Sequence, residues 1–163
     1  MTTLRIAIID DDPFVADHLR LALASELPTA ELYMIEEPVP VAGYDVYVVD
    51  NDFGGEAHGA ELHDRLRAIA PGAELIVYSA ELDTGFLRRL MRGGAREVFD
   101  KSSSTDRDAM IQRIVDADTR KRSGLRRRST GLGAVGAVTA LLHEWNHRLQ
   151  RSSAASNRVE VRS

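Results

Sequence analysis

The sequence has no cysteine among its 163 residues, and only 6% of them are aromatic. Without thiols the chain cannot form disulfides, bind a metal through thiolates or use a cysteine nucleophile. No basic segment followed by a long apolar run opens the chain, so we expect no secretory signal. The longest stretch of small apolar residues, 131–142, is well short of the roughly 20 residues that span a bilayer. These absences predict a cytoplasmic protein with no membrane span.

Hydrophobic residues make up 44% of the chain, which is enough for a globular core. The charge is divided unevenly. Residues 1–118 carry 11 Lys and Arg against 23 Asp and Glu, whereas residues 119–163 carry 10 against 2. This asymmetry predicts an acidic folded domain followed by a basic appendage. We expect a domain over 1–120, a basic linker over 121–132, an amphipathic helix over 133–151 and a disordered tail over 152–163.

The acidic part alternates short β-branched runs with helical patterns. We expect strands at 4–9, 31–35, 45–49, 74–78 and 96–99, and helices at 13–26, 60–70, 83–92 and 105–120. This alternation is typical of an α/β fold with a five-stranded, parallel, doubly wound sheet. Two prolines between Ile35 and Asp45 predict that the second helix is shortened or missing. Asp12 can cap the first helix, and Ser103 or Ser104 the last.

Polar residues follow four of the expected strands. Asp10 and Asp11 follow the first, Asp50 the third, Ser79 the fourth and Lys101 the fifth. Ligands of such sheets bind outside the carboxyl ends of the strands, so these side chains should converge. Three carboxylates together repel one another unless a cation intervenes, and Mg²⁺ suits their oxygens. The set therefore predicts a magnesium site.

The same residues suit phosphoryl transfer to an aspartate. Asp50 would be the nucleophile, and the metal and Lys101 would neutralise the charge on the phosphoryl oxygens. Ser79 would offer a hydroxyl to the transferred phosphate, and the small Ala80 beside it would leave access.

Four motifs, in their order and spacing, resemble the receiver domain of two-component response regulators over about residues 3–120. They are IAIIDDDP (6–13), VYVVDND (46–52), VYSAE (77–81) and GGAREVFDK (93–101). The resemblance implies the flavodoxin-like receiver fold, Mg²⁺ as cofactor and Asp50 as phosphoacceptor. It also implies that Ser79 and Lys101 are the catalytic hydroxyl and lysine. The implied metal ligands are Asp10, Asp11, Asp50 and the backbone carbonyl of Asp52, with Asp11 a direct ligand.

The implied partners are a sensor histidine kinase or a histidine phosphotransfer protein as donor, and a downstream protein as target. The output surface would include Ala80, Val98, Phe99, Arg88 and Arg92. The sequence departs from the family pattern in the missing helix and in a loop one residue longer before Gly59. Gly54 and Ser102 stand where the family has proline, and Val98 stands where it has a rotating aromatic.

The C-terminal segment has a separate pattern. Its apolar residues recur at spacings of 3 and 4, which predicts a docking helix or a short dimer seam: Val135, Val138, Leu142, Trp145 and Leu149. His143 to His147 form an HExxH, but a zinc protease needs a third ligand and a cleft, so we do not expect one. The core of residues 143–148 also resembles the phosphoacceptor helix of HWE-type histidine kinases, which would make His147 phosphorylatable. The other interpretation is a plain helix whose histidines face solvent.

The basic run from Arg120 to Arg128 has no interleaved aromatics, which favours a solvated linker over a nucleic-acid contact. The sequence therefore predicts a response regulator that signals by protein contact, without a DNA-binding output domain and without enzymatic activity beyond its own phosphotransfer. A homodimer through the C-terminal helix is one form of that contact. The alternative is a scaffold that is never phosphorylated, in which the C-terminal helix mediates docking.

Overall fold

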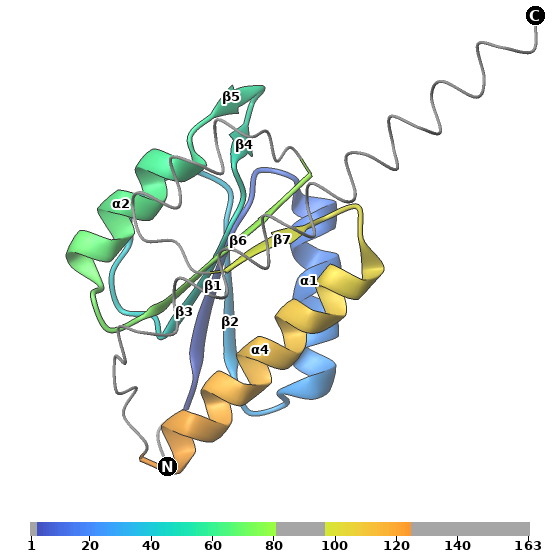
Figure 1. The fold of residues 1–163 in the computed structure, drawn as a ribbon, viewed down its shortest axis with the longest axis vertical. Helices are drawn as coiled ribbons and strands as arrows, with labels where there is room; N and C mark the ends of the chain where they lie inside the picture. Colours follow the sequence, from blue (N-terminus) through green and yellow to red (C-terminus); the bar gives the residue numbers. More distant parts are fainter. Residues whose placement is uncertain (1–2, 81–96, 125–163) are drawn as a thin grey trace, which may run out of the picture. The chain divides into compact units, whose positions relative to one another are not determined.

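The computed structural model describes residues 3–80 and 97–124, drawn in colour in Figure 1. The predicted helix 83–92, most of the linker, the C-terminal helix 133–151 and the tail 152–163 lie outside these residues. In chain order the described elements are β1 (Arg5–Ile9), α1 (Pro13–Glu26), β2 (Glu31–Ile35), β3 (Val46–Val49), β4 (Asp52–Phe53), β5 (Glu56–Ala57), α2 (Gly59–Ile69), β6 (Glu74–Ser79), β7 (Val98–Asp100) and α4 (Ser104–Arg122). Among the described residues, no helix is long and apolar enough to cross a bilayer.

Five strands form one parallel sheet in the order β2-β1-β3-β6-β7. This is the strand order of flavodoxin-like folds, so the predicted α/β class is confirmed. The register aligns the carboxyl ends of the central strands. Ile9 of β1 lies opposite Val49 of β3, and Val49 lies opposite Val77 of β6. The residues that follow β1 and β3 are therefore neighbours at one edge of the sheet.

Helices cover both faces of the sheet, with α1 and α4 on one side and α2 on the other (Figure 1). Alternate strand residues point to opposite faces. Ile6 and Ile8 of β1 pack in the cluster that includes the α1 and α4 side chains, while Ala7 and Ile9 pack in the cluster under α2. Burial on both faces explains why the central strands β1 and β3 have nearly continuous apolar sequences.

No helix connects β2 to β3: residues 36–45, which the structure describes throughout, form only bends and irregular chain. The prediction of a missing second helix is confirmed. Tyr44 provides part of the missing cover, because it packs on the cluster under α2 and lies edge-on to Tyr47 at 5.6 Å. The Tyr47 hydroxyl donates to the carbonyl of Val41 at 2.7 Å and ties the connection to the sheet.

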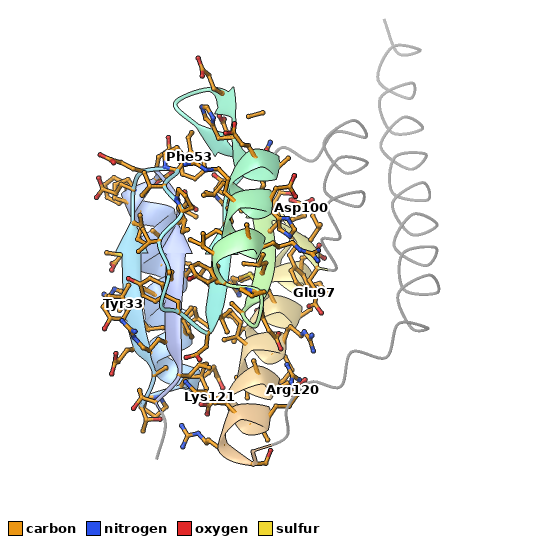
Figure 2. The ribbon with its side chains drawn as sticks, turned by 90° about the vertical axis from the view of Figure 1, so that its left-hand side faces the viewer. Tyr33, Phe53, Glu97, Asp100, Arg120 and Lys121 are labelled. Carbon is orange, nitrogen blue, oxygen red and sulfur yellow. The ribbon has the colours of Figure 1, made fainter. Side chains whose placement is uncertain are left out.

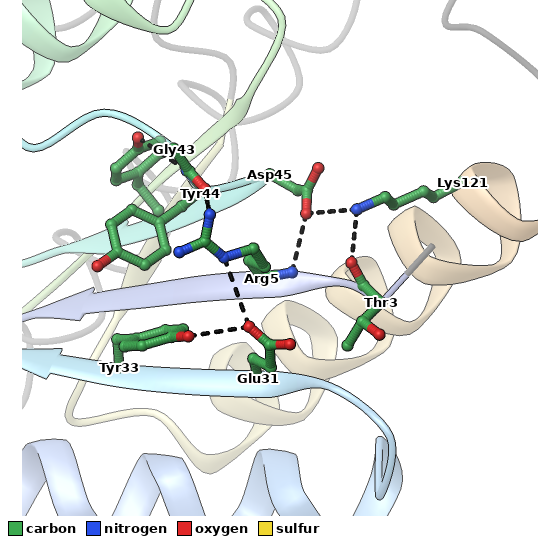
Figure 3. A network of polar contacts seen from close by, with 9 residues as sticks. Thr3, Arg5, Glu31, Tyr33, Gly43, Tyr44, Asp45 and Lys121 are labelled. Atoms are coloured by element: carbon green, nitrogen blue, oxygen red, sulfur yellow. Dashed lines mark hydrogen bonds and ion pairs between the residues drawn. The ribbon is translucent and has the colours of Figure 1, made fainter. Parts of the chain in front are cut away.

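Polar contacts close the amino-terminal end of the sheet near this connection (Figure 3). The Arg5 guanidinium lies 5.1 Å from the ring centroid of Tyr44 and 5.5 Å from that of Tyr33, within cation–π range. Lys121 Nζ, near the end of α4, donates to Asp45 Oδ2 at 2.6 Å. The same Asp45 oxygen accepts the Arg5 backbone N–H at 2.8 Å. The last turn of α4 is thus bound to the start of the sheet.

Several element bounds differ from those predicted. Helix α4 begins after Ser103, whose hydroxyl accepts the Asp106 N–H, and it continues to Arg122, which pairs with Asp118 one turn earlier. Lys121 and Arg122, expected in the linker, are therefore helical. Strand β7 is shifted to 98–100, since Asp100 pairs in register with Ser79, which itself ends β6.

Sequence patterns did not predict the short antiparallel hairpin of β4 and β5, at the top of Figure 1. Its two turn residues, Gly54 and Gly55, have φ of 63° and 85°. Two successive residues with positive φ form the turn that suits a tight hairpin, and glycine adopts it without steric cost. The Gly-Gly pair was a recognisable hairpin signal.

Candidate functional site

Three carboxylates meet at the carboxyl end of the sheet. Asp10 follows β1, Asp11 is the next residue, and Asp50 follows β3; one carboxylate oxygen from each lies within 4.8 Å of the others. Asp10 and Asp50 are buried, and Asp11 is exposed. The parallel register of β1 and β3 brings the first and third together, as described above. The structure therefore places the three predicted side-chain metal ligands in one cluster.

Lys101 neutralises the two buried members of this cluster. Its Nζ lies 2.6 Å from Asp10 Oδ2 and 2.7 Å from Asp50 Oδ2, and its side chain is only 12% exposed. Burial alone would lower the pKa of Lys101, but the hydrogen bonds to Asp10 and Asp50 outweigh it and raise that pKa. Burial raises the pKa of Asp10, and the contact with Lys101 opposes this rise. The lysine is therefore a fixed positive charge beside the predicted phosphoacceptor.

The backbone after β3 fixes the orientation of Asp50. The N–H of Asn51 donates to Asp50 Oδ1 at 2.6 Å. The carbonyl of Asn51 in turn accepts from the N–H of His58 at 2.9 Å and of Gly59 at 3.1 Å. The N-cap and the first residue of α2 are thus bonded directly to Asn51, the residue that follows the predicted nucleophile.

Gly59 makes this close approach feasible. A Cβ at this position would lie 2.6 Å from Asn51 Cα and 2.9 Å from the Asp50 carbonyl oxygen, both backbone atoms. Real Cβ atoms do not approach this closely, so any other residue would push α2 away from the loop. In the sequence Gly59 is only a marker of loop length, and no pattern there predicts its close approach to Asp50 and Asn51.

The two exposed acids beside Asp10 have different roles. Asp11 Oδ2 accepts the N–H of Gly54 at 2.7 Å, which ties the β4–β5 hairpin to the carboxylate cluster. Asp12 caps α1: its Oδ1 accepts from the N–H of Phe14 at 2.9 Å and of Val15 at 3.2 Å. Asp12 is accordingly a helix cap, as its position before Pro13 predicted.

Ser79 and Lys101 lie on neighbouring strand ends. The N–H of Lys101 donates to the Ser79 carbonyl at 3.1 Å, and Ser79 is fully buried while Ala80 beside it is exposed. In β7, Phe99 packs on the core that α1 and α4 cover, and Val98 is half-buried opposite Val77. Arg88, Arg92 and His147 lie outside the described residues, so their predicted roles stay predictions.

Two further predictions concern Asp52 and the basic run. Asp52 is the first residue of β4 and pairs with Ala57; the ligand role of its carbonyl stays a prediction. The described members of the basic run contact acidic side chains of the same domain. These pairs are Arg120 with Glu74, Lys121 with Asp45 and Arg122 with Asp118. The part of the run that the structure describes therefore compensates local charge; the absence of a DNA contact stays a prediction.

The donor set fits Mg²⁺. This ion prefers oxygen ligands in an octahedron and usually keeps several positions for water and phosphate. Three converging carboxylates, one exposed to solvent and two bonded to or near Lys101, supply such oxygens. The nitrogen and sulfur ligands that zinc favours are absent from this cluster of described residues.

No protein-family model and no curated protein matches the chain. Solved structures do. A CheY-like response regulator receiver domain protein from Methanospirillum hungatei JF-1 matches with a TM-score of 0.62 at 18% identity, over 75% of this chain and 99% of its own. The N-terminal domain of an uncharacterized protein from Wolinella succinogenes matches with a TM-score of 0.63 at 19% identity, over 75% and 99% of the two chains.

The signal receiver domain of a DNA-binding response regulator from Colwellia psychrerythraea 34H matches with a TM-score of 0.58 at 24% identity, over 69% of this chain and 98% of its own. At these identities the likeness shows the fold. The chain has the flavodoxin-like fold of response regulator receiver domains, as the sequence motifs predicted.

Proposed function

We propose that this chain is a phosphoacceptor response regulator of a two-component system, phosphorylated on Asp50. One observation carries the proposal: the Lys101 ammonium lies within 2.7 Å of Asp50 and 2.6 Å of Asp10, in a carboxylate cluster at the carboxyl edge of a receiver fold. A lysine with only 12% of its side chain exposed, bonded to two acids that follow different strands, is far more specific than any of these residues alone. Ionisable groups that combine burial with a specific charged partner cluster at functional sites.

The donor would be a phosphohistidine of a sensor kinase or of a phosphotransfer protein. An Asp50 carboxylate oxygen forms the new bond to phosphorus while the bond from phosphorus to the donor nitrogen breaks. The imidazole keeps the electron pair of the broken bond, and the product is an acyl phosphate. Lys101 faces the charge that builds on the phosphoryl oxygens, and the buried Ser79 stands at the adjacent strand end to hydrogen-bond the product.

Asp10, Asp11 and Asp50 would hold Mg²⁺, with the carbonyl of Asp52 as a further ligand. When bound, the ion would supply Lewis-acid neutralisation of the transferred oxygens. The chain itself keeps the carboxylates in place: Asn51 N–H holds Asp50, Asp12 N–H holds Asp10 at 3.1 Å, and Gly54 N–H holds Asp11. These backbone donors fix the geometry before a ligand arrives.

The signal would pass to a downstream protein target rather than to DNA. Ala80, Val98, Phe99, Arg88 and Arg92 form the proposed output surface, whose arrangement the acyl phosphate would shift by a change in population. We propose a cytoplasmic location, no enzymatic activity beyond phosphotransfer at Asp50, and the C-terminal helix 133–151 as a contact for a partner or a second copy.

Intact-mass analysis after incubation with acetyl phosphate tests the proposal. The wild type should gain one phosphoryl group with Mg²⁺ and none with a chelator, and Asp50→Asn should gain none. Asp12→Asn is the matched control, because asparagine is an equally good helix cap and the variant should still be modified. If neither acetyl phosphate nor a phosphohistidine donor modifies a folded, Mg²⁺-bound wild type, the unphosphorylated scaffold replaces this proposal.

A further inference from the structure

Lys101 occupies a very short connection. Strand β7 ends at Asp100 and helix α4 begins at Ser104, so only three residues link them. Figure 2 shows Asp100 toward the same end of the sheet as Phe53 of the hairpin, and Arg120 and Lys121 at the opposite end. The connection therefore lies at the edge where the carboxylates gather. The backbone of this connection fixes the position of the Lys101 Cα, from which the flexible side chain extends.

The Asp100 carboxylate closes this connection. Its Oδ1 accepts from the N–H of Ser102 at 2.7 Å and from the Ser102 hydroxyl at 2.6 Å. Its carbonyl accepts the N–H of Ser103 at 3.1 Å. Bonds between residue i and the donors of residue i+2 form a turn that locks the residue in between. That residue is Lys101.

Asp106 ties the same turn to α4. It forms a reciprocal cap with Ser103: its N–H donates to Ser103 Oγ at 3.2 Å, and Ser103 Oγ donates to Asp106 Oδ1 at 3.1 Å. The second oxygen, Asp106 Oδ2, accepts the N–H of Asp100 at 3.0 Å. A helix cap alone would not require this second bond, because it leaves the helix and reaches the end of β7.

We propose that Asp100 and Asp106, together with Ser102, are positioning residues that hold Lys101 against Asp10 and Asp50. The inference deepens the proposed function and rests on it for its purpose. The turn fixes the Lys101 backbone from both sides, and the Lys101 N–H is bonded to Ser79. A lysine has four rotatable side-chain bonds, so a fixed starting point reduces the freedom that must be lost to hold its ammonium on two carboxylates.

The chain offers a direct assay, since it contains only two lysines, Lys101 and Lys121. The rate at which an amine-reactive reagent labels each one can be measured by peptide mass spectrometry on the full chain. Lys121 is bonded to Asp45 at the far end of the sheet and serves as the internal control. The readout requires no phosphate and no metal, so it does not depend on phosphorylation of Asp50.

In Asp100→Ala the reagent should label Lys101 faster than in the wild type, while the labelling rate of Lys121 should not change. We expect a severalfold increase, because an ammonium held less firmly against Asp10 and Asp50 is more accessible to the reagent. Ser102→Ala, which removes only the hydroxyl bond, should show a smaller increase. Asp100→Asn keeps the Oδ1 acceptor and should restore the wild-type rate, which separates geometry from charge. Asp108→Ala, an exposed acid of α4 bonded to Arg107, should change nothing.

A second measurement separates a positioning role from a general loss of stability. If Asp100 acts through Lys101, the single variant Asp100→Ala should be phosphorylated by acetyl phosphate more slowly than the wild type. Adding Asp100→Ala to Lys101→Met should cause no further loss of phosphorylation rate. Unchanged Lys101 amine labelling in folded Asp100→Ala and Ser102→Ala would overturn the inference, whatever the phosphorylation result. A wild type that takes no phosphate, with Lys101 amine labelling that still responds as expected, would remove the proposed function and leave the positioning role.

Discussion

The ammonium nitrogen of Lys101 lies 2.7 Å from Asp50 Oδ2, although the two residues are 51 positions apart in the sequence. Through the 2.6 Å contact with Asp10, the same nitrogen joins the ends of three strands, β1, β3 and β7. Two buried carboxylates with no cation would destabilise the fold, because each is removed from water. Lys101 thus has a structural role before any chemistry takes place.

This role predicts how Lys101→Met responds to magnesium. The substitution leaves Asp10 and Asp50 without their cation and should lower the unfolding free energy by about 3–5 kcal/mol in metal-free buffer. Added Mg²⁺ should bind the variant more tightly than the wild type and raise its melting temperature by more. Thermal unfolding with and without Mg²⁺ measures both effects.

Lys121→Met is the matched control. Its partner Asp45 is about one-third exposed, so the pair is worth at most about 1 kcal/mol and has no connection with the cluster. Equal stabilisation of wild type and Lys101→Met by Mg²⁺ would contradict the assignment of the cluster as the metal site.

Gly59→Ala should disturb the backbone at Asp50 and Asn51. The added Cβ would meet Asn51 Cα at 2.6 Å and the Asp50 carbonyl oxygen at 2.9 Å, so α2 or the loop must move. We expect a loss of about 1–3 kcal/mol in the free energy of unfolding, the usual cost of overpacking, and a lower rate of Asp50 phosphorylation. Urea denaturation and the intact-mass assay measure the two. In Gly72→Ala the Cβ meets no atom within 4 Å, so this control should be close to neutral; an equal effect in both variants would refute the steric argument.

The sequence predicted the strands and the acidic residues well because both depend on short-range patterns. A buried parallel strand such as Val46–Val49 is a continuous apolar run, and Asp50 marks its end. Helix α1 was predicted with its observed bounds, since Asp12 and Pro13 mark its start. The unhelical connection before Asp45 followed from its prolines. These features are decided by residues close to one another in the chain.

The contacts that the sequence did not predict depend on distant residues. Gly54 meets Asp11 from 43 positions away, and Gly59 is required by the backbone of Asn51, which no periodicity reveals. The turn around Lys101 depends on an acid, Asp106, that composition alone presents as a surface charge. The substitution of Ser102 for the usual proline was visible, but its bonds to Asp100 follow only from three-dimensional geometry.

Substitutions of Asp11 and Asp12 should affect different properties, Mg²⁺ affinity for Asp11 and stability for Asp12. Asp12→Ala removes the cap of α1 and should cost about 1 kcal/mol of stability, with the Mg²⁺ affinity almost unchanged. Asp11→Ala should weaken Mg²⁺ binding, because its carboxylate belongs to the cluster, with a smaller effect on α1. Calorimetric titration with Mg²⁺ and urea unfolding test the pair. If Asp12→Ala lost Mg²⁺ affinity and Asp11→Ala did not, Asp12 rather than Asp11 would be the metal ligand.

His63 should make the stability of the domain depend on pH. Its side chain is 2% exposed on the inner face of α2, and its Nδ1 lies 3.7 Å from Asp64 Oδ1, beyond hydrogen-bond distance. Burial lowers the pKa of His63 below its ordinary value of 6.5, and the contact with Asp64 only partly opposes this. The unfolded chain therefore binds the proton more readily than the fold. The stabilising effect of a neutral His63 is complete above the unfolded pKa and is lost as the pH falls below it, by at most about 1.4 kcal/mol per pH unit.

Urea unfolding at about pH 7.5 and about pH 5.5 measures this loss, because the two values lie on either side of the unfolded histidine pKa. His63→Leu puts an apolar side chain that cannot bind a proton in the same place. This variant should lose less stability between the two pH values than the wild type. The exposed His18 provides the control, and His18→Gln should keep the wild-type dependence. A wild type that is equally stable at both pH values, or a His63→Leu variant with an unchanged pH dependence, would show that His63 does not bind its proton more weakly in the fold.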